Sequence, residues 1–143
     1  MGPWLLHVLA LSLEVARLSP SALAYLGDSV FETHARRAFL WPPRPQNDLC
    51  LKVRALSCAK GQSDALASLQ KNPHFRLTEA ETEWLRRGRN AAGRGPRSAS
   101  PTVYRAASSL ETLIGFLHLT NATRCAEVMD RVVRDFDALS VET

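Results

Sequence analysis

Apolar residues recur at helical spacing through most of the chain, and no two segments alternate as a pair of strands would. The spacing predicts a packed first helix over residues 4–13. It also predicts a second helix to about Leu40, with Ser19 as the N-cap and Pro20 in the first helical position. Three prolines within residues 42–45 end that helix.

The middle of the chain continues the helical pattern. A third helix is expected to be capped at residues 47–48 and to be interrupted at Gly61. The pattern resumes over residues 63–69, and the pair at 72–73, Asn-Pro, closes it. We therefore expect one interrupted helix here, with its apolar side facing the core.

A capping box marks the next predicted helix. Thr78 and Glu81 have the spacing at which each side chain can accept a hydrogen bond from the other residue's backbone N–H. A short helix through Leu85 should follow. From Arg86 the composition changes, because residues 86–101 hold five arginines and three glycines but no acid. We predict that this segment is a basic, mobile loop.

Two further helices complete the pattern. One begins at Pro101 and carries Glu111, and the last begins at Asn121 or Thr123. With 143 residues, 45% of them hydrophobic and 22% charged, the chain fits a single domain over residues 1–143. The predicted fold class is all-α, a helical bundle with irregular connections.

The charge and the cysteine content of the chain restrict its possible ligands and its expected compartment. The 18 Lys and Arg residues outnumber 14 Asp and Glu, and all but three of the 18 are arginines, which suit bidentate contacts with phosphate. The three cysteines and four histidines lack the spacing of a zinc site. Unpaired cysteines favour a reducing compartment, so we expect the cytoplasm. The apolar run at residues 4–13 is too short to span a bilayer, and no membrane association is expected.

Two acids stand in otherwise apolar helical segments. Asp28 follows residues 22–27 in the second helix, with Glu32 one turn later on the same face, and Glu111 is the only charge in residues 106–117. Burial of a carboxylate costs free energy unless a cation, a metal ion or a hydrogen-bond network compensates. Carboxylate oxygens suit Mg²⁺ or Mn²⁺, which need few protein acids when substrate phosphate completes the coordination. Asp28 and Glu111 are therefore candidate metal ligands for phosphodiester hydrolysis.

Each acid also has a purely structural interpretation. Asp28 has the spacing of an ion pair with Arg36 or Arg37, and Glu32 has that of an ordinary surface pair with Arg36. Glu111 fits a salt bridge within the core. The sequence alone leaves both interpretations open.

The basic segment at residues 86–101 has two interpretations of its own. It fits a solvated connector between helices. It also fits a surface for nucleic acid, because its glycines let the backbone approach a phosphate chain and its arginines bind phosphate without reading bases. Few aromatic residues accompany the arginines, which favours a duplex over a single strand bound by stacking.

Together these motifs resemble the catalytic domain of the ribonuclease III family, and specifically its compact branch, Mini-ribonuclease III, which lacks a separate domain for binding double-stranded RNA. The likeness runs from about Pro20 to Leu119. The signature helix of the family is matched at residues 23–32 and the second acidic helix at residues 110–117. A motif typical of the branch is matched at residues 85–91, and a weaker fourth segment at residues 57–62. Residues 39–43 resemble cyanobacterial or plastid members, so the plastid stroma is the expected location if the source is a photosynthetic eukaryote.

The resemblance implies a homodimeric endoribonuclease that cleaves double-stranded RNA with Mg²⁺ or Mn²⁺ and leaves a 5′-phosphate and a 3′-hydroxyl. It implies the precursor of 23S ribosomal RNA as substrate and admits a ribosomal protein as a helper. Asp28 and Glu111 match the acids that hold the catalytic metal ion and position the attacking water. The residues that would hold the RNA backbone are Arg86, Arg87, Arg89, Asn90, Arg94 and Lys60.

Two positions depart from full-length ribonuclease III. Ala24 stands where those enzymes carry a Glu, and Ser108 stands where they carry an Asp. The implied metal site is thus poorer in acids, and Glu32 is the residue that would compensate as a further ligand. The alternative function is a non-catalytic ribonuclease III-like module that binds RNA or the ribosome. The presence of both Asp28 and Glu111 argues against it.

Overall fold

Helices make up all the regular structure in residues 2–141, the part of the chain that the structure describes. This computed structural model confirms the all-α fold predicted from the helical spacing. In chain order the helices are α1 (Pro3–Ala16), α2 (Pro20–Phe39), α3 (Gln46–Ser57), α4 (Ala59–Lys71), α5 (Glu79–Ala91), α6 (Pro101–Thr120) and α7 (Ala122–Val141).

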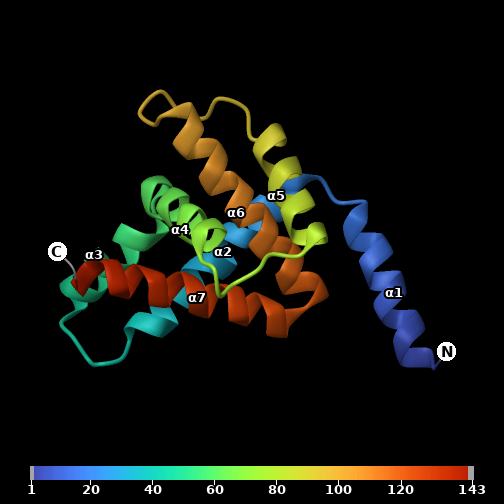
Figure 1. The fold of residues 1–143 in the computed structure, drawn as a ribbon, viewed down its shortest axis with the longest axis horizontal. Coiled ribbons are helices and arrows are strands. Elements are labelled where there is room, and N and C mark those ends of the chain that lie inside the picture. The colour runs from blue at the N-terminus through green and yellow to red at the C-terminus, as the bar shows by residue number, and fades with distance from the viewer. Residues whose placement is uncertain (1, 142–143) are drawn as a thin grey trace.

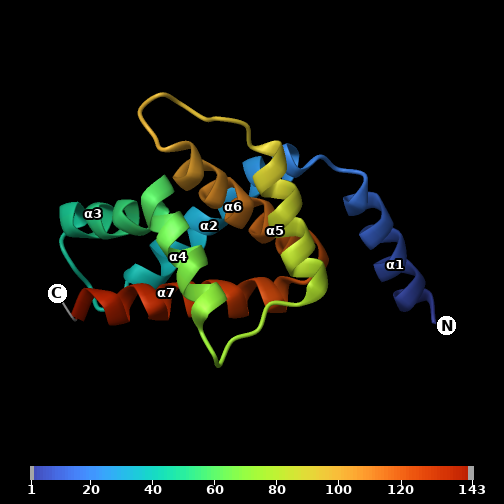
Figure 2. The same cartoon turned by 45° about the horizontal axis from the view of Figure 1, so that its top comes forward.

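Helix α6 lies at the centre of the molecule. It packs against α2, α4, α5 and α7, and Figures 1 and 2 show these helices gathered around it. Leu110, Leu113 and Ile114 on α6 are fully buried, as expected of a helix that is apolar on most of its circumference. The helix that carries Glu111 is therefore held on several sides.

Helices α2 and α6 approach each other closely enough for their backbones to touch. A Cβ atom at Gly27 of α2 would overlap the backbone carbonyl of Glu111, and one at Gly115 of α6 would overlap the carbonyl of Leu23. Only glycine leaves room for this approach, because it has no Cβ. The contact brings the segment of α2 around residue 28 beside the segment of α6 around residue 111.

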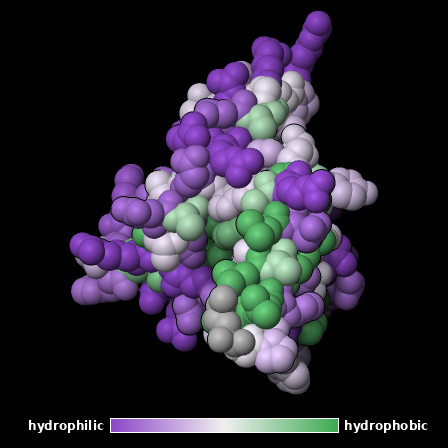
Figure 3. Space-filling view, turned by 90° about the vertical axis from the view of Figure 1, so that its right-hand side faces the viewer, coloured by the Kyte–Doolittle hydropathy of each residue, from purple (hydrophilic) through white to green (hydrophobic). Residues whose placement is uncertain are grey.

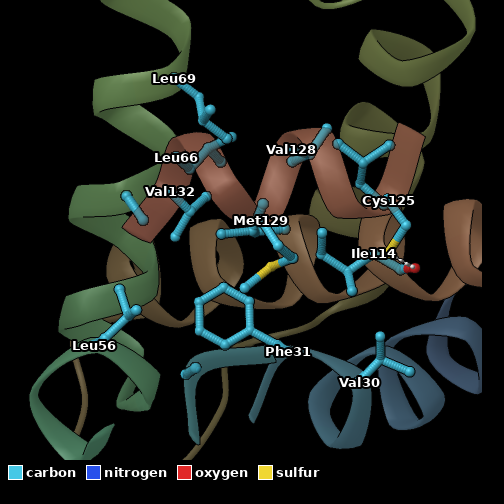
Figure 4. Close-up of a cluster of buried hydrophobic side chains, with 14 of the residues drawn as sticks. Val30, Phe31, Leu56, Leu66, Leu69, Ile114, Cys125, Val128, Met129 and Val132 are labelled. Atoms are coloured by element: carbon cyan, nitrogen blue, oxygen red, sulfur yellow. Dashed lines mark hydrogen bonds between the residues drawn. The ribbon is translucent and has the colours of Figure 1, made fainter. Parts of the chain in front are cut away.

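A cluster of apolar side chains fills the space between α6 and the helices α2, α3, α4 and α7. Figure 4 shows Phe31 of α2, Leu56 of α3, Leu66 of α4 and Met129 of α7 converging there, and each is almost fully buried. Burial of one such side chain contributes roughly 1.5–3 kcal/mol. The core thus joins helices from both halves of the chain.

Two of the three predicted N-caps are confirmed. The Ser19 side chain caps α2, and the capping box of Thr78 and Glu81 opens α5 with both reciprocal hydrogen bonds formed. Helix α3 instead begins at Gln46, so residues 47–48 lie in its first turn and not at its cap. The preceding prolines, which cannot enter the helix interior, set this earlier start.

The break in the middle of the chain lies at Cys58 and not at Gly61 as predicted. Cys58 ends α3 and serves as the N-cap of α4, while Gly61 lies in the first turn of α4. A Cβ atom at Gly61 would overlap the carbonyls of Ala55 and Leu56 at the end of α3. Gly61 therefore permits the tight packing of two successive helices and does not interrupt either one.

The predicted basic loop is shorter than expected. Helix α5 runs on to Ala91, so the segment from Arg86 to that residue is helical and only residues 92–100 form the loop. Gly88 is buried against Thr112 of α6 with no space for a Cβ atom. This packing extends α5 past the point at which its apolar pattern ends, since tertiary contacts supply most helical stability.

The first predicted helix forms, but the prediction that it packs into the core is wrong. Figures 1 and 2 show α1 standing to one side of the bundle. Among its described side chains only Val15 is buried, in a small cluster with Leu23 and Trp84. Trp4 is 75% exposed and Leu13 70%, and Figure 3 shows hydrophobic residues gathered on this face. Its apolar residues surround the helix, so one contact cannot bury them. No helix within the described residues combines the length and hydropathy needed to cross a membrane.

Candidate active site

The two predicted acids meet in space. Asp28 of α2 and Glu111 of α6 line the same pocket, which has a volume of about 260 Å³ and opens to solvent. The backbone contact at Gly27 places the next residue of α2 beside α6. Ala24 and Ser108, one turn before each acid, also line this pocket, and their small side chains leave it open.

Glu111 is the more buried of the two acids. It is half-buried, whereas Asp28 is exposed. Burial raises the pKa of the Glu111 carboxyl group, the negative charge of Asp28 raises it further, and the amide of Gln62 on α4 opposes both, which leaves the pKa at about 7. Glu111 therefore exchanges its proton close to neutral pH.

Neither Asp28 nor Glu111 forms the ion pair that was its alternative, purely structural interpretation. None of the ion pairs within the described residues includes Asp28 or Glu111. Asp28 is thus not paired with Arg36 or Arg37, and Glu111 forms no salt bridge in the core. Two acids that face one pocket without a cation repel each other, and a bound cation would relieve that repulsion.

The donor set fits a hard divalent cation that shares its coordination with a substrate. Mg²⁺ and Mn²⁺ accept one or two carboxylates, with waters and phosphate oxygens completing the shell. Within residues 2–141, no group of three or more His, Cys, Asp or Glu side chains is placed to hold a metal ion. The pocket therefore suits an ion held by Asp28, Glu111 and a phosphate better than one enclosed by protein ligands alone.

Glu32 shares a pocket with Asp28 but not with Glu111. Its carboxylate forms an ion pair of 3.0 Å with Arg36, the surface pair that the sequence offered as its plain interpretation. With Asp28 and Arg54 it lines a neighbouring pocket between α2 and α3, which does not reach Glu111. This geometry gives no support to Glu32 as a metal ligand.

The first arginines of the basic segment are held by their own helix. Arg86 forms two hydrogen bonds with Glu83, of 2.9 Å from Nε and 2.6 Å from Nη2. The guanidinium of Arg87 lies over the ring of Trp84, 4.1 Å from its centre. Cation–π contacts of this kind are worth roughly 0.5–1 kcal/mol at exposed sites. Both side chains therefore have partners on α5.

A second polar pocket lies beyond these residues. Arg89 and Asn90 at the end of α5 line it with Arg105 of α6, and its volume is about 500 Å³. The Nε atom of Arg105 donates a hydrogen bond of 2.8 Å to the carbonyl oxygen of Gly93, which ties the loop to α6. Sequence reasoning missed Arg105 because it lies outside the arginine-rich run. Its position one turn before Ser108 on the helix of Glu111 was the available signal.

The remaining two candidates lie elsewhere. Lys60 forms an ion pair of 2.9 Å with Asp64 and lines an apolar pocket with Phe136 of α7, away from the two acids. Arg94 is exposed in the loop of residues 92–100. The structure thus separates Lys60 from the arginines with which it was grouped.

Sequence reasoning also missed Gln62 as a neighbour of the site. It is 1% exposed, and its amide lies close enough to Glu111 to lower the pKa of that carboxyl group. The signal was its helical spacing with Leu66 and Leu69, which places a polar amide on the apolar side of α4. Only the weak motif at residues 57–62 had pointed to this part of the chain.

Comparison with known proteins supports the motifs. A family model described as the ribonuclease III domain matches residues 21–122. A protein named Mini-ribonuclease 3 from Synechocystis sp. is 48% identical over 115 residues, which cover 80% of this chain and 78% of the relative. A protein of the same name from Gloeobacter violaceus is 40% identical over 116 residues, 81% of this chain and 83% of the relative. The crystal structure of a protein from Fusobacterium nucleatum superimposes with a TM-score of 0.71 at 26% identity and covers 83% of this chain and 94% of its own.

Proposed function

Because this chain belongs to the ribonuclease III family and is an endoribonuclease, we propose that Asp28 and Glu111 form its active site and that it cleaves double-stranded RNA there. The observation that carries the proposal is the single open pocket to which α2 and α6 each contribute one acid. The absence of an ion pair at either acid, within the described residues, leaves both carboxylates available for a ligand.

We propose that the two carboxylates hold Mg²⁺, with Mn²⁺ as the alternative. When bound, such an ion neutralises charge on the reacting phosphate and lowers the pKa of a water. The close contact of α2 and α6 holds the side chains of Asp28 and Glu111 beside the same pocket. Glu111 must lose its proton to act as a ligand, and its pKa of about 7 allows this near neutral pH.

The proposed path of the RNA backbone runs from the acids across the end of α5. Arg89, Asn90 and Arg105 line one pocket there, and Arg94 lies in the adjoining loop. Arg86 and Arg87, which contact Glu83 and Trp84 on the same helix, would add phosphate contacts. Lys60 has the least support, because it lies in a different pocket.

The finer identity of the substrate rests on the resemblance to Mini-ribonuclease III. We propose that the protein trims the ends of the 23S ribosomal RNA precursor, leaves a 5′-phosphate and a 3′-hydroxyl, and acts in the cytoplasm or the plastid stroma. We also propose a homodimer, because two-fold symmetry would present one site to each strand of a duplex. A ribosomal protein that presents the RNA is the proposed helper.

Cleavage of a long RNA duplex in the presence of Mg²⁺ tests this function. The wild-type protein should cut the duplex and leave ends that accept a 3′ ligation adaptor, whereas Asp28→Asn should leave it intact. Lys71→Ala, an exposed change at the end of α4, serves as the control and should cut normally. A wild-type protein that retards the duplex on a gel without cutting it would instead establish the non-catalytic RNA-binding module.

A further inference from the structure

Gln62 carries a buried donor whose hydrogen bonding is incomplete. The residue is 1% exposed, and its Nε2 atom forms no hydrogen bond of ordinary length and angle, although the amide lies near enough to Glu111 to lower the pKa of that carboxyl group. In the described part of the chain, the only other buried side-chain atom in this condition is Oγ of Ser57, the last residue of α3, five positions before Gln62 and across the junction of α3 and α4. Unsatisfied buried donors are rare in folded proteins, so a pair of them beside one junction calls for a cause.

The junction faces the two acids. Ser57 lines a pocket with Asp28, and the amide of Gln62 acts on the Glu111 carboxyl group. The Gln62 amide is not in contact with solvent, because only 1% of the residue is exposed. Ser57 thus lies beside the neighbouring pocket that Asp28 also lines, and Gln62 lies beside Glu111.

A buried donor without a partner lowers stability, and a chain that keeps one usually gains function from it. The Glu111 carboxylate is the acceptor within reach of Gln62. On this basis, which rests on the proposed function of Asp28 and Glu111, we propose that Gln62 is a positioning residue. Its Nε2 atom donates to one oxygen of Glu111 when a divalent cation is bound, and this holds the other oxygen toward Asp28 and the cation.

Hydrogen bonds of this kind orient carboxylate ligands in metal sites, and loss of the donor typically weakens metal binding tenfold to a hundredfold. A residue that merely fills the core behaves differently. Its replacement lowers the stability of the metal-free protein and leaves the affinity for metal unchanged. Stability and metal affinity therefore separate the two roles.

The test compares Gln62→Met, which keeps the length of the side chain but removes the donor, with Gln70→Met, an exposed change two turns later on α4. Mn²⁺ is titrated into each protein without RNA by isothermal calorimetry, and Tm is measured without metal. We expect Gln62→Met to bind Mn²⁺ about tenfold more weakly than wild type, with an equal or higher Tm. Gln70→Met should match wild type in both measurements.

A second variant, Gln62→Leu, guards against a packing defect specific to Met, and the Mg²⁺ concentration for half-maximal duplex cleavage gives an independent reading. That concentration should rise about tenfold in both Gln62 variants. If the wild type cleaves RNA and both Gln62 variants match it in Mn²⁺ affinity and Mg²⁺ requirement, the role of Gln62 is overturned and the proposed function stands. A wild type that neither binds Mn²⁺ nor cleaves would overturn both.

Discussion

At the scale of single residues, Gly27 determines how close the two acids of the candidate site lie, because it allows α2 to contact α6. Gly27 lets α2 touch the backbone of Glu111, and Asp28 follows it directly. The two acids therefore owe their common pocket to a backbone contact between their helices and not to an interaction of their own side chains. Their charges oppose the arrangement, since Asp28 raises the pKa of Glu111.

Gly27→Ala should destabilise the protein and abolish cleavage. The added Cβ atom would overlap the Glu111 carbonyl, so α2 and α6 must separate, at a cost of at least about 2 kcal/mol. Urea denaturation followed by circular dichroism measures this loss. Gly2→Ala is the matched control, because a Cβ atom there meets nothing within 4 Å. A Gly27→Ala protein as stable as the control would show that the helices need not touch.

Asp28→Asn should abolish cleavage but raise stability at pH 8. The folded-state pKa of Glu111, about 7 against an ordinary 4.5, means that the folded chain binds this proton more tightly than the unfolded chain does. Ionisation of Glu111 therefore destabilises the fold as the pH rises from about 4.5 past 7.

Removal of the Asp28 charge removes one of the two causes of that raised pKa. The Tm of Asp28→Asn should thus exceed that of wild type at pH 8, and the difference should shrink below pH 5, where Glu111 is protonated in both proteins. Calorimetric unfolding at the two pH values provides the measurement. A lower Tm for the variant at pH 8 would mean that Asp28 has a stabilising partner.

At the scale of elements, packing decides where a helix ends and whether it belongs to the core. Helix α5 continues to Ala91 because Gly88 seats it on α6. It is also joined to α7, where the guanidinium of Arg124 donates two hydrogen bonds to Glu81, of 2.8 and 2.9 Å. Burial raises the pKa of Glu81, but these bonds and that from Thr78 outweigh it and lower the pKa. Among the described side chains of α1, only Val15 is buried against the rest of the protein.

Removal of residues 2–13 should leave the bundle intact. The deletion keeps Val15 and its contacts with Leu23 and Trp84, and it removes side chains such as Trp4 that are mostly exposed. Tm should change by less than about 3 °C, which corresponds to roughly 1 kcal/mol for a chain of this size. The shortened protein should also associate less, because an exposed apolar surface is lost. A fall in Tm of more than about 10 °C would show that α1 packs more closely than described.

At the scale of the whole molecule, the acids and the cations occupy adjoining regions. The pocket of Asp28 and Glu111 includes Gly88 of α5, and the next residue of that helix, Arg89, lines the second pocket with Arg105. A phosphate chain that reaches the acids would thus continue along a basic surface. Such contacts supply affinity without reading sequence.

Arg89→Ala combined with Arg105→Ala should weaken binding of duplex RNA and reduce its salt dependence. Each lost phosphate contact lowers the slope of log K against log salt concentration by about one, so the double variant should lose about two. Fluorescence anisotropy over a range of KCl concentrations measures the slope. Lys71→Ala combined with Arg134→Ala removes the same charge from exposed positions on α4 and α7 and is the control. Equal slopes for the two double variants would place the RNA elsewhere.

The sequence by itself determined what depends on neighbours along the chain. The Ser19 cap, the Thr78 capping box and the helical class of the fold follow from local hydrogen bonding and spacing. Asp28 and Glu111 stood out for the same reason, as charges within apolar helical patterns. Local rules are sufficient for these features because the interacting groups lie within one or two turns of each other.

Only the tertiary structure decided what depends on contacts between distant segments. It brought Asp28 to Glu111, extended α5 through the first arginines and left α1 outside the core. It also placed Gln62 beside Glu111 and left Glu32 with Arg36. None of these follows from helical periodicity, because each is set by how closely two helices approach, and that distance depends on side chains far apart in the chain.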